Sequence, residues 1–181
     1  MDLNIQNRKS QGIGELSQIF SMLKEVSSGY SYVQIGLILR ESNLISKLLL
    51  SCESWHRLNK YHVVWLEEVD FSFFRQLFNA HSKTCKEIYL LESGKIPVRF
   101  LISMRRIMFW WHIMHVNKED MLYRVYSAQK LSPVQGDWVK LLELDKKLFN
   151  ISMEDENIQS TSSFQLKILE ENSPQAHPQL Y

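Results

Sequence analysis

The sequence has few of the residues that disulfide-rich, membrane-spanning or turn-rich proteins require. Of its 181 residues, two are cysteine, four are proline and six are glycine. Two cysteines cannot build the disulfide framework of a small secreted domain, and no apolar stretch follows a basic segment at the N-terminus. The longest apolar run, residues 44–50, includes Ser46 and Lys47 and is too short to cross a bilayer. We therefore expect an intracellular protein of the nucleus or cytoplasm that is neither secreted nor membrane-bound.

The chain is instead rich in apolar residues with helical spacing. Hydrophobic residues make up 45% of it and aromatic residues 12%, which is enough for a folded core. Apolar residues recur at intervals of three and four, as at Leu16 and Phe20. The sequence therefore predicts an all-α fold, an irregular bundle of about seven to eight helices. We expect a flexible N-terminus over residues 1–12, a single helical domain over residues 13–171 and a disordered tail over residues 172–181.

Local start and stop signals separate the expected helices. Asn59 is a candidate N-cap, Gly94 is placed to end a short helix, and Pro97 suits the first position of the next one. The predicted helices span residues 13–27, 31–50, 60–79, 86–93, 97–116, 118–130, 136–149 and 161–171.

The polar residues do not form a recognisable catalytic motif. A two-metal polymerase or nuclease needs carboxylates fixed around a metal pair, whereas the adjacent acids here lie on predicted helix surfaces or near helix starts. The sequence has no glycine-rich phosphate loop, GxSxG elbow or HExxH pair. Cys52 and His56, like His112 and His115, have helical spacing, but the two pairs are distant and supply too few thiolates to favour zinc. We therefore expect no enzymatic activity, no cofactor and no metal.

Charge is distributed unevenly along the chain, although its net charge is only +1. Residues 81–118 hold seven lysines and arginines against two acids, whereas residues 119–171 hold six basic residues against ten acids. A basic middle favours contact with a polar or anionic partner, and an acidic end is typical of a solvated face.

One face of the helix predicted after Pro97 combines basic and aromatic side chains. At 100° per residue, Arg99, Arg106 and Trp110 lie within about 40° of each other. We call these three residues, with Lys95 as a supporting charge, the basic stripe. Guanidinium groups can neutralise phosphates and an indole ring can stack on a base, which is typical of single-stranded nucleic-acid binding. The alternative is an ordinary solvated helix face with the tryptophan packed against a neighbouring helix.

Four further charged residues lie on apolar helix faces. Arg105 falls on the apolar side of its predicted helix, Asp70 interrupts an apolar stripe, and Arg40 and Glu41 interrupt the most apolar helix. Buried charges require partners. We therefore predict a buried ion-pair network in which Asp70 or Glu41 pairs with Arg105 or Arg40, with a structural rather than a catalytic role.

A series of short motifs runs through most of the chain. They are Leu39-Arg40-Glu41-Ser42, Ser51-Cys52-Glu53-Ser54-Trp55, Leu66-Glu67-Glu68-Val69-Asp70, Phe74-Arg75-Gln76-Leu77, Tyr89-Leu90-Leu91-Glu92-Ser93-Gly94, Ile96-Pro97-Val98-Arg99, Arg105-Arg106 and Gly136-Asp137-Trp138-Val139. In this order they resemble the region that follows the reverse transcriptase domain in animal non-LTR (LINE-type) retrotransposon polyproteins, over about residues 13–168. The resemblance implies a helical segment similar to a thumb and its connector, which would hold template and primer during synthesis.

The chain also departs from these polyproteins. It lacks the aromatic-Ala-Asp-Asp motif that carries the metal-binding aspartates, any endonuclease, and the cysteine and histidine cluster that often closes such polyproteins. Cys85 follows Thr84 where relatives tend to have proline. The resemblance therefore implies a fragment that cannot reverse-transcribe.

Two functional hypotheses of different classes follow, together with a third in which the chain is a non-functional transposon relic. The first is a non-catalytic accessory segment that binds RNA or DNA through the basic stripe. The second is a helical protein-interaction module that docks through exposed aromatic side chains such as Trp65 and Trp111. The missing polymerase domain and a second copy of the chain are further expected partners.

Overall fold

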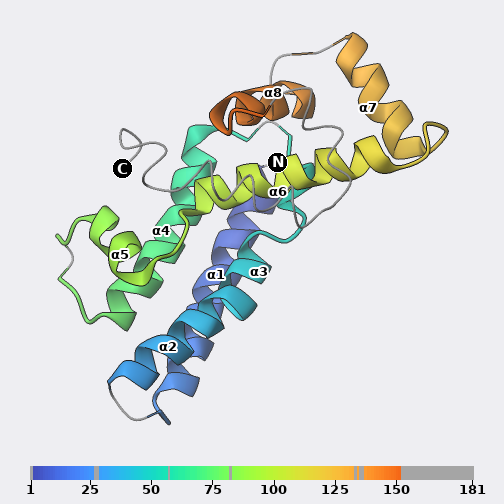
Figure 1. The fold of residues 1–181 in the computed structure, drawn as a ribbon. Coiled ribbons are helices and arrows are strands. Elements are labelled where there is room, and N and C mark those ends of the chain that lie inside the picture. Colours follow the sequence, from blue (N-terminus) through green and yellow to red (C-terminus); the bar gives the residue numbers. More distant parts are fainter. Residues whose placement is uncertain are drawn as a thin grey trace. The chain divides into compact units, whose positions relative to one another are not determined.

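A computed structural model describes residues 2–151 except residues 27, 28, 57, 82, 133, 135 and 136. Every regular element in this part of the chain is helical and none is a strand (Figure 1). The predicted all-α fold of about seven to eight helices is therefore confirmed. The helix predicted at 161–171 and the tail predicted at 172–181 lie outside the described residues.

The chain divides into two compact units where the sequence predicted one domain. Each unit has buried apolar residues of its own. Unit 1 comprises Met1–Ser51 and Leu58–Phe100, and unit 2 comprises Cys52–Arg57 and Leu101–Tyr181.

In unit 1, a long first helix contacts the helices that follow it. Helix α1 lies against α2, α3 and α4, and α4 contacts α5 (Figure 1). The elements are α1 (Asp2–Leu23), α2 (Tyr30–Leu39), a π-helical turn (Arg40–Ile45), α3 (Ser46–Leu48), α4 (Lys60–Leu77) and α5 (Lys86–Ser93).

Helix α1 begins at Asp2, so the expected flexible N-terminus over residues 1–12 is corrected. The physical reason is that Ile5 and Gly12 are buried on the same helical stripe as Leu16 and Leu23. Few apolar residues precede position 13, so the periodicity alone gave no signal for these additional turns.

The helix predicted over residues 31–50 is interrupted by a π-helical turn. Helix α2 continues into the turn at Arg40, and α3 follows it directly. A π-helical turn inserts extra backbone into a helix and changes the direction of the side chains that follow. Arg40, the first residue of the turn, is buried, as are Leu44 and Ile45 near its end.

Gly36→Ala is expected to lower the free energy of unfolding by about 1–3 kcal/mol because it overpacks the contact between α2 and α4. A Cβ atom at residue 36 would lie 2.4 Å from Cδ1 of Leu77, whose side chain is buried. Gly14 in α1 is the matched control, since a Cβ atom there meets no heavy atom within 4 Å. Gly14→Ala should raise stability by about 0.5–1 kcal/mol. Urea unfolding measures both changes, and equal effects would contradict the close approach at Leu77.

The N-cap predicted for α4 and the stop signal predicted for α5 are confirmed. The Asn59 side chain accepts a hydrogen bond of 2.9 Å from the backbone N–H of His62, and the His62 ring accepts one from the Asn59 backbone in return. Helix α5 begins at Lys86 after Cys85 and ends at Gly94, whose φ of 63° is left-handed. Only glycine adopts this backbone conformation without steric cost, which explains why the helix stops there.

Three helices and one short 3₁₀ turn supply the described part of unit 2. Helix α6 (Val98–His115) starts one residue after Pro97, and its residues from Leu101 onward belong to this unit. Asp120 caps the next helix by accepting a hydrogen bond of 2.8 Å from the backbone N–H of Leu122. The remaining elements are the turn Cys52–Ser54, α7 (Met121–Leu131) and α8 (Trp138–Leu148).

Candidate functional site

A buried arginine and a buried aspartate form a bidentate ion pair in unit 1. Nε and Nη2 of Arg40 each donate a hydrogen bond of 2.7 Å to a different carboxylate oxygen of Asp70. The two side chains are 0% and 2% exposed. Burial is the largest influence on the Asp70 carboxyl and raises its pKa, while the hydrogen bonds and charge of Arg40 oppose that rise. The pair joins the π-helical turn to α4.

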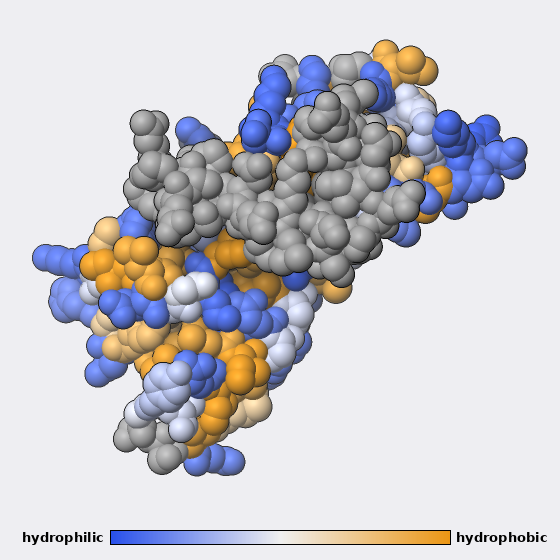
Figure 2. Space-filling view, viewed as in Figure 1, coloured by the Kyte–Doolittle hydropathy of each residue, from blue (hydrophilic) through white to orange (hydrophobic). Residues whose placement is uncertain are grey.

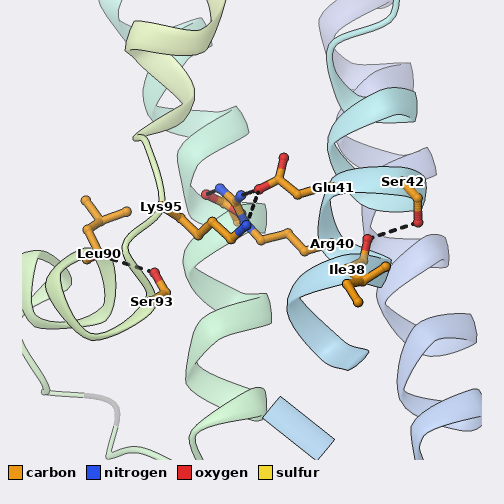
Figure 3. A network of polar contacts seen from close by, with 8 residues as sticks. Ile38, Arg40, Glu41, Ser42, Leu90, Ser93 and Lys95 are labelled. Atoms are coloured by element: carbon orange, nitrogen blue, oxygen red, sulfur yellow. Dashed lines mark hydrogen bonds and ion pairs between the residues drawn. The ribbon is translucent and has the colours of Figure 1, made fainter. Parts of the chain in front are cut away.

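Two more charges complete this network at its exposed side. Nη1 of Arg40 donates a hydrogen bond of 2.5 Å to Glu41, and Nζ of Lys95 lies 3.5 Å from the same carboxylate oxygen. In Figure 3 the side chains of Arg40 and Lys95 converge on Glu41. The guanidinium carbon of Arg40 lies 4.8 Å from the centre of the Phe74 ring, a cation–π contact. Lys95, predicted as a nucleic-acid contact, thus belongs to a structural network.

Arg99 makes a second bidentate pair in unit 1. Its Nε and Nη2 donate hydrogen bonds of 2.6 and 2.7 Å to the two carboxylate oxygens of Glu67. The Glu67 side chain is buried, whereas the Arg99 side chain is 59% exposed. The hydrogen bonds that Arg99 donates to Glu67 raise the pKa of Arg99. Arg99 therefore reaches the surface with its charge already neutralised by a carboxylate.

Arg106 is buried in unit 2. Its Nη1 donates a hydrogen bond to Oδ2 of Asp145, and the Ser103 hydroxyl donates one of 2.8 Å to Oδ1 of the same residue. The Arg106 side chain is only 3% exposed. Burial raises the pKa of Asp145, and Arg106 and Ser103 oppose that rise. This cluster links α6 to α8.

Trp110 is also a core residue rather than a surface ring. Its relative exposure is 0%, and it is the largest fully buried side chain of the described residues. The Lys146 ammonium lies 3.5 Å from the centre of its ring, so a charge from α8 covers one face of the indole. A buried ring covered in this way cannot stack on a base.

The basic stripe is therefore not presented as a surface, and the sequence-based placement of Arg106 and Trp110 is corrected. Both side chains are buried, and Arg99 is held by Glu67. The reason is that α6 is apolar around much of its circumference, so a helical wheel does not define one buried face. Contacts with other helices determine that the face of α6 carrying Arg106 is buried.

The structure brings together three of the four residues in the predicted ion-pair network. Asp70 and Glu41 both pair with Arg40. Arg105 is instead half-buried in unit 2, with Nη1 4.0 Å from Sγ of Cys52. Burial raises the pKa of Cys52 to about 11, so its side chain is a neutral thiol at physiological pH.

Glu67 and Asp145 were not identified from the sequence as the partners of Arg99 and Arg106. The position of Asp145 within its helix could have revealed it. Asp145 shares a helical stripe with Trp138, Leu142 and Phe149, all of which are buried. An acid in such a position needs a buried cation, by the reasoning that had identified Asp70. Glu67 and Glu68 are among the adjacent acids that the sequence placed on helix surfaces or near helix starts, and only the fold shows that Glu67 is buried.

The described part of unit 2 contains an open apolar pocket. Its volume is about 180 Å³. Trp138 is fixed in its wall, because the indole N–H donates a hydrogen bond of 2.5 Å to the Glu53 carbonyl and the ring meets Phe109 and Tyr126 edge to face. Such a cavity can accept a large apolar side chain. The lining consists of Ser54, His56, Phe109, Ile113, Leu122, Val125, Tyr126, Gln129 and Trp138.

Helix α7 extends this apolar surface outward. Met121, Leu122 and Val125 are 78%, 43% and 46% exposed and fall within an arc of about 100° on the helix. In Figure 2 the surface at the upper right, over α7, is a mixture of hydrophilic residues and small hydrophobic patches. Exposed apolar side chains beside an apolar cavity are typical of a docking surface. We call the pocket together with these three residues the α7 surface.

The aromatic residues expected to dock on a partner are placed differently. Trp111 is buried and Trp65 is half-buried, with the Lys9 ammonium 5.9 Å from the centre of its ring. The α7 surface was missed because its exposed members are aliphatic, and a wheel of residues 118–130 could not tell which apolar side faces a neighbour.

No family model, curated protein or solved structure matches this chain. The resemblance to the region behind a retrotransposon reverse transcriptase therefore depends on the short motifs of the sequence. None of the helices in the described part of the chain combines the length and apolar character needed to cross a membrane. Within the same residues, no three histidine, cysteine or acidic side chains are grouped closely enough to hold a metal ion.

Proposed function

We propose that this chain is a non-catalytic helical protein-interaction module that descends from the region behind a LINE-type reverse transcriptase. Support for the descent comes from the motif residues, which pair with one another. Arg40 of the first motif pairs with Asp70 of the third, and Glu67 of the third pairs with Arg99 of the sixth. These pairs give the motif residues a structural role that does not depend on a catalytic motif.

The observation that carries the docking function is the α7 surface. It joins an apolar pocket to exposed aliphatic side chains on one helix. The basic stripe supports nucleic-acid binding less well, because Arg106 and Trp110 are buried and Arg99 is paired. Of the two functional classes, protein docking is therefore favoured.

The chemistry of the α7 surface defines the partner we propose. An amphipathic helix from another protein can insert one large apolar side chain into the pocket and lay its neighbours along α7. Arg124 and Lys130 are exposed and lie on opposite sides of the apolar arc of α7. Acidic residues along both edges of the incoming helix would complement these two charges.

Binding of a labelled amphipathic peptide, with leucine and phenylalanine on one face and glutamate along its edges, tests this function. The Leu122→Glu/Val125→Glu variant is expected to weaken binding by about tenfold or more, because it places charges beside the apolar pocket. Leu144→Glu is the matched control, since Leu144 is 62% exposed on α8 and does not line the pocket. Fluorescence anisotropy of the peptide gives the affinities.

Two results would contradict the proposed docking function. One is peptide binding that is absent, or that responds equally to the two variants. The other is tight binding of single-stranded RNA that weakens steeply between two salt concentrations, since such dependence reports phosphate contacts. The second result would favour the nucleic-acid accessory function.

A further inference from the structure

We propose that the pocket of the α7 surface is selective for a tyrosine side chain, whose ring lies among aromatic wall residues and whose hydroxyl exchanges a hydrogen bond with the Gln129 amide. This inference rests on the docking function proposed above and names the anchor residue of the partner helix. The partner remains an amphipathic helix with acidic edges, because exposed Arg124 and Lys130 lie on opposite sides of the apolar arc of α7.

The pocket has the size and the walls that suit one aromatic ring. Its volume is about 180 Å³. A cavity of about 150 Å³ holds a benzene molecule, so the pocket fits a six-membered ring with a small substituent. Phe109 and Tyr126 each meet the Trp138 ring edge to face, with ring centres 5.9 and 6.3 Å apart. A further ring among these three gains aromatic contacts that a leucine side chain cannot make.

Gln129 places a polar group at one end of this apolar wall. Leu122, Val125, Tyr126 and Gln129 all line the pocket and share one stripe of α7. At a rise of about 1.5 Å per residue, Gln129 lies about 10 Å along the helix axis from Leu122. The wall is therefore aliphatic at one end and carries a primary amide at the other. A ring with a polar tip matches this arrangement better than a wholly apolar side chain does.

The Gln129 amide can bond a ligand without first breaking a bond within the described part of the chain. Its side chain is half-buried and forms no hydrogen bond with another described residue. An amide both donates and accepts, so it can bond a phenol hydroxyl in either sense. Ser54 and His56, the other polar lining residues, are exposed, so water competes more strongly for their hydrogen bonds. We therefore expect Gln129 to distinguish tyrosine from phenylalanine.

Peptides that differ only in the anchor residue test this selectivity. The labelled amphipathic peptide described above carries tyrosine, phenylalanine or leucine at its central apolar position, and fluorescence anisotropy gives each affinity. The tyrosine peptide is expected to bind about fivefold more tightly than the phenylalanine peptide, because one neutral hydrogen bond separates them. The leucine peptide should bind about fivefold more weakly than the phenylalanine peptide, because it lacks the ring contacts.

The Gln129→Met variant shows whether the amide causes the preference, because methionine has a similar length but no amide. The preference for the tyrosine over the phenylalanine peptide should fall from about fivefold to none. Gln34→Met is the matched control, since Gln34 is exposed on α2 in unit 1, and it should leave the preference unchanged. Equal binding of the two peptides, or a preference that survives in Gln129→Met, would overturn the tyrosine selectivity while leaving the docking function in place.

Small-molecule probes decide the selectivity of the pocket if no peptide binds and the docking function fails. Titrations with p-cresol and with toluene, followed by the NMR signal of the Trp138 indole N–H, compare the two side-chain rings without a helix. The affinity for p-cresol relative to toluene should fall by about fivefold in Gln129→Met, which would support a site for a phenol. A relative affinity that is the same in both proteins would overturn it.

Discussion

Asp70→Ala is expected to lower the free energy of unfolding by about 3–5 kcal/mol, because it removes one partner of a buried ion pair. The variant leaves the Arg40 guanidinium, which is 0% exposed, without the carboxylate that accepts two of its hydrogen bonds. Glu41 accepts only one hydrogen bond from Arg40 and is itself exposed, so it cannot replace Asp70. Urea unfolding followed by circular dichroism measures the loss.

Two further variants show whether the buried charge is the cause. Glu68→Ala, on the same helix, removes only an exposed pair with Lys9 at 3.1 Å and should cost at most about 1 kcal/mol. Arg40→Met/Asp70→Leu removes both buried charges and should recover most of the stability lost in Asp70→Ala. A double variant as unstable as the single one would show that the pair is needed for its geometry and not only for charge balance.

Trp110→Ala is expected to destabilise the chain by about 3–5 kcal/mol, because it opens a cavity in the core of unit 2. The ring is 0% exposed, and the Lys146 ammonium that lies over it would lose its aromatic partner. His112→Ala is the matched control on the same helix, since His112 is exposed and should change stability by no more than about 0.5 kcal/mol.

Thermal unfolding of the Trp110→Ala and His112→Ala variants decides between a core and a surface role for this tryptophan. A Trp110→Ala variant that keeps full stability but loses RNA binding would contradict the burial of the ring. It would restore the base-stacking role that the sequence suggested. A loss of stability with no specific effect on RNA binding agrees with the core position.

Most of the fold could be predicted because helix boundaries depend on local residues. Asn59 caps α4 and Gly94 ends α5 at the positions that their chemistry requires. The start of α1 could not be predicted in this way. Its first turns bury Ile5, and the burial of one apolar residue leaves no periodic signal within a short segment.

The candidate site was less predictable because burial depends on more than one helix. Asp70 and Arg40 were found from the sequence, since each is a charge within an otherwise apolar stripe. Arg105 and Arg106 are adjacent in a helix that is apolar on several sides, and the helical wheel assigned the buried position to Arg105. The structure buries Arg106, because Asp145 on α8 supplies its carboxylate.

The sequence by itself determined that the chain is helical, where most of its helices begin and end, and which charges on apolar stripes need partners. These properties depend on spacing and capping within a few residues. Only the tertiary structure decided that Trp110 is core, that Arg99 is neutralised by Glu67, and that α7 leaves apolar side chains beside a pocket. Each of these outcomes depends on which helices face each other, and pattern within one helix does not contain that information.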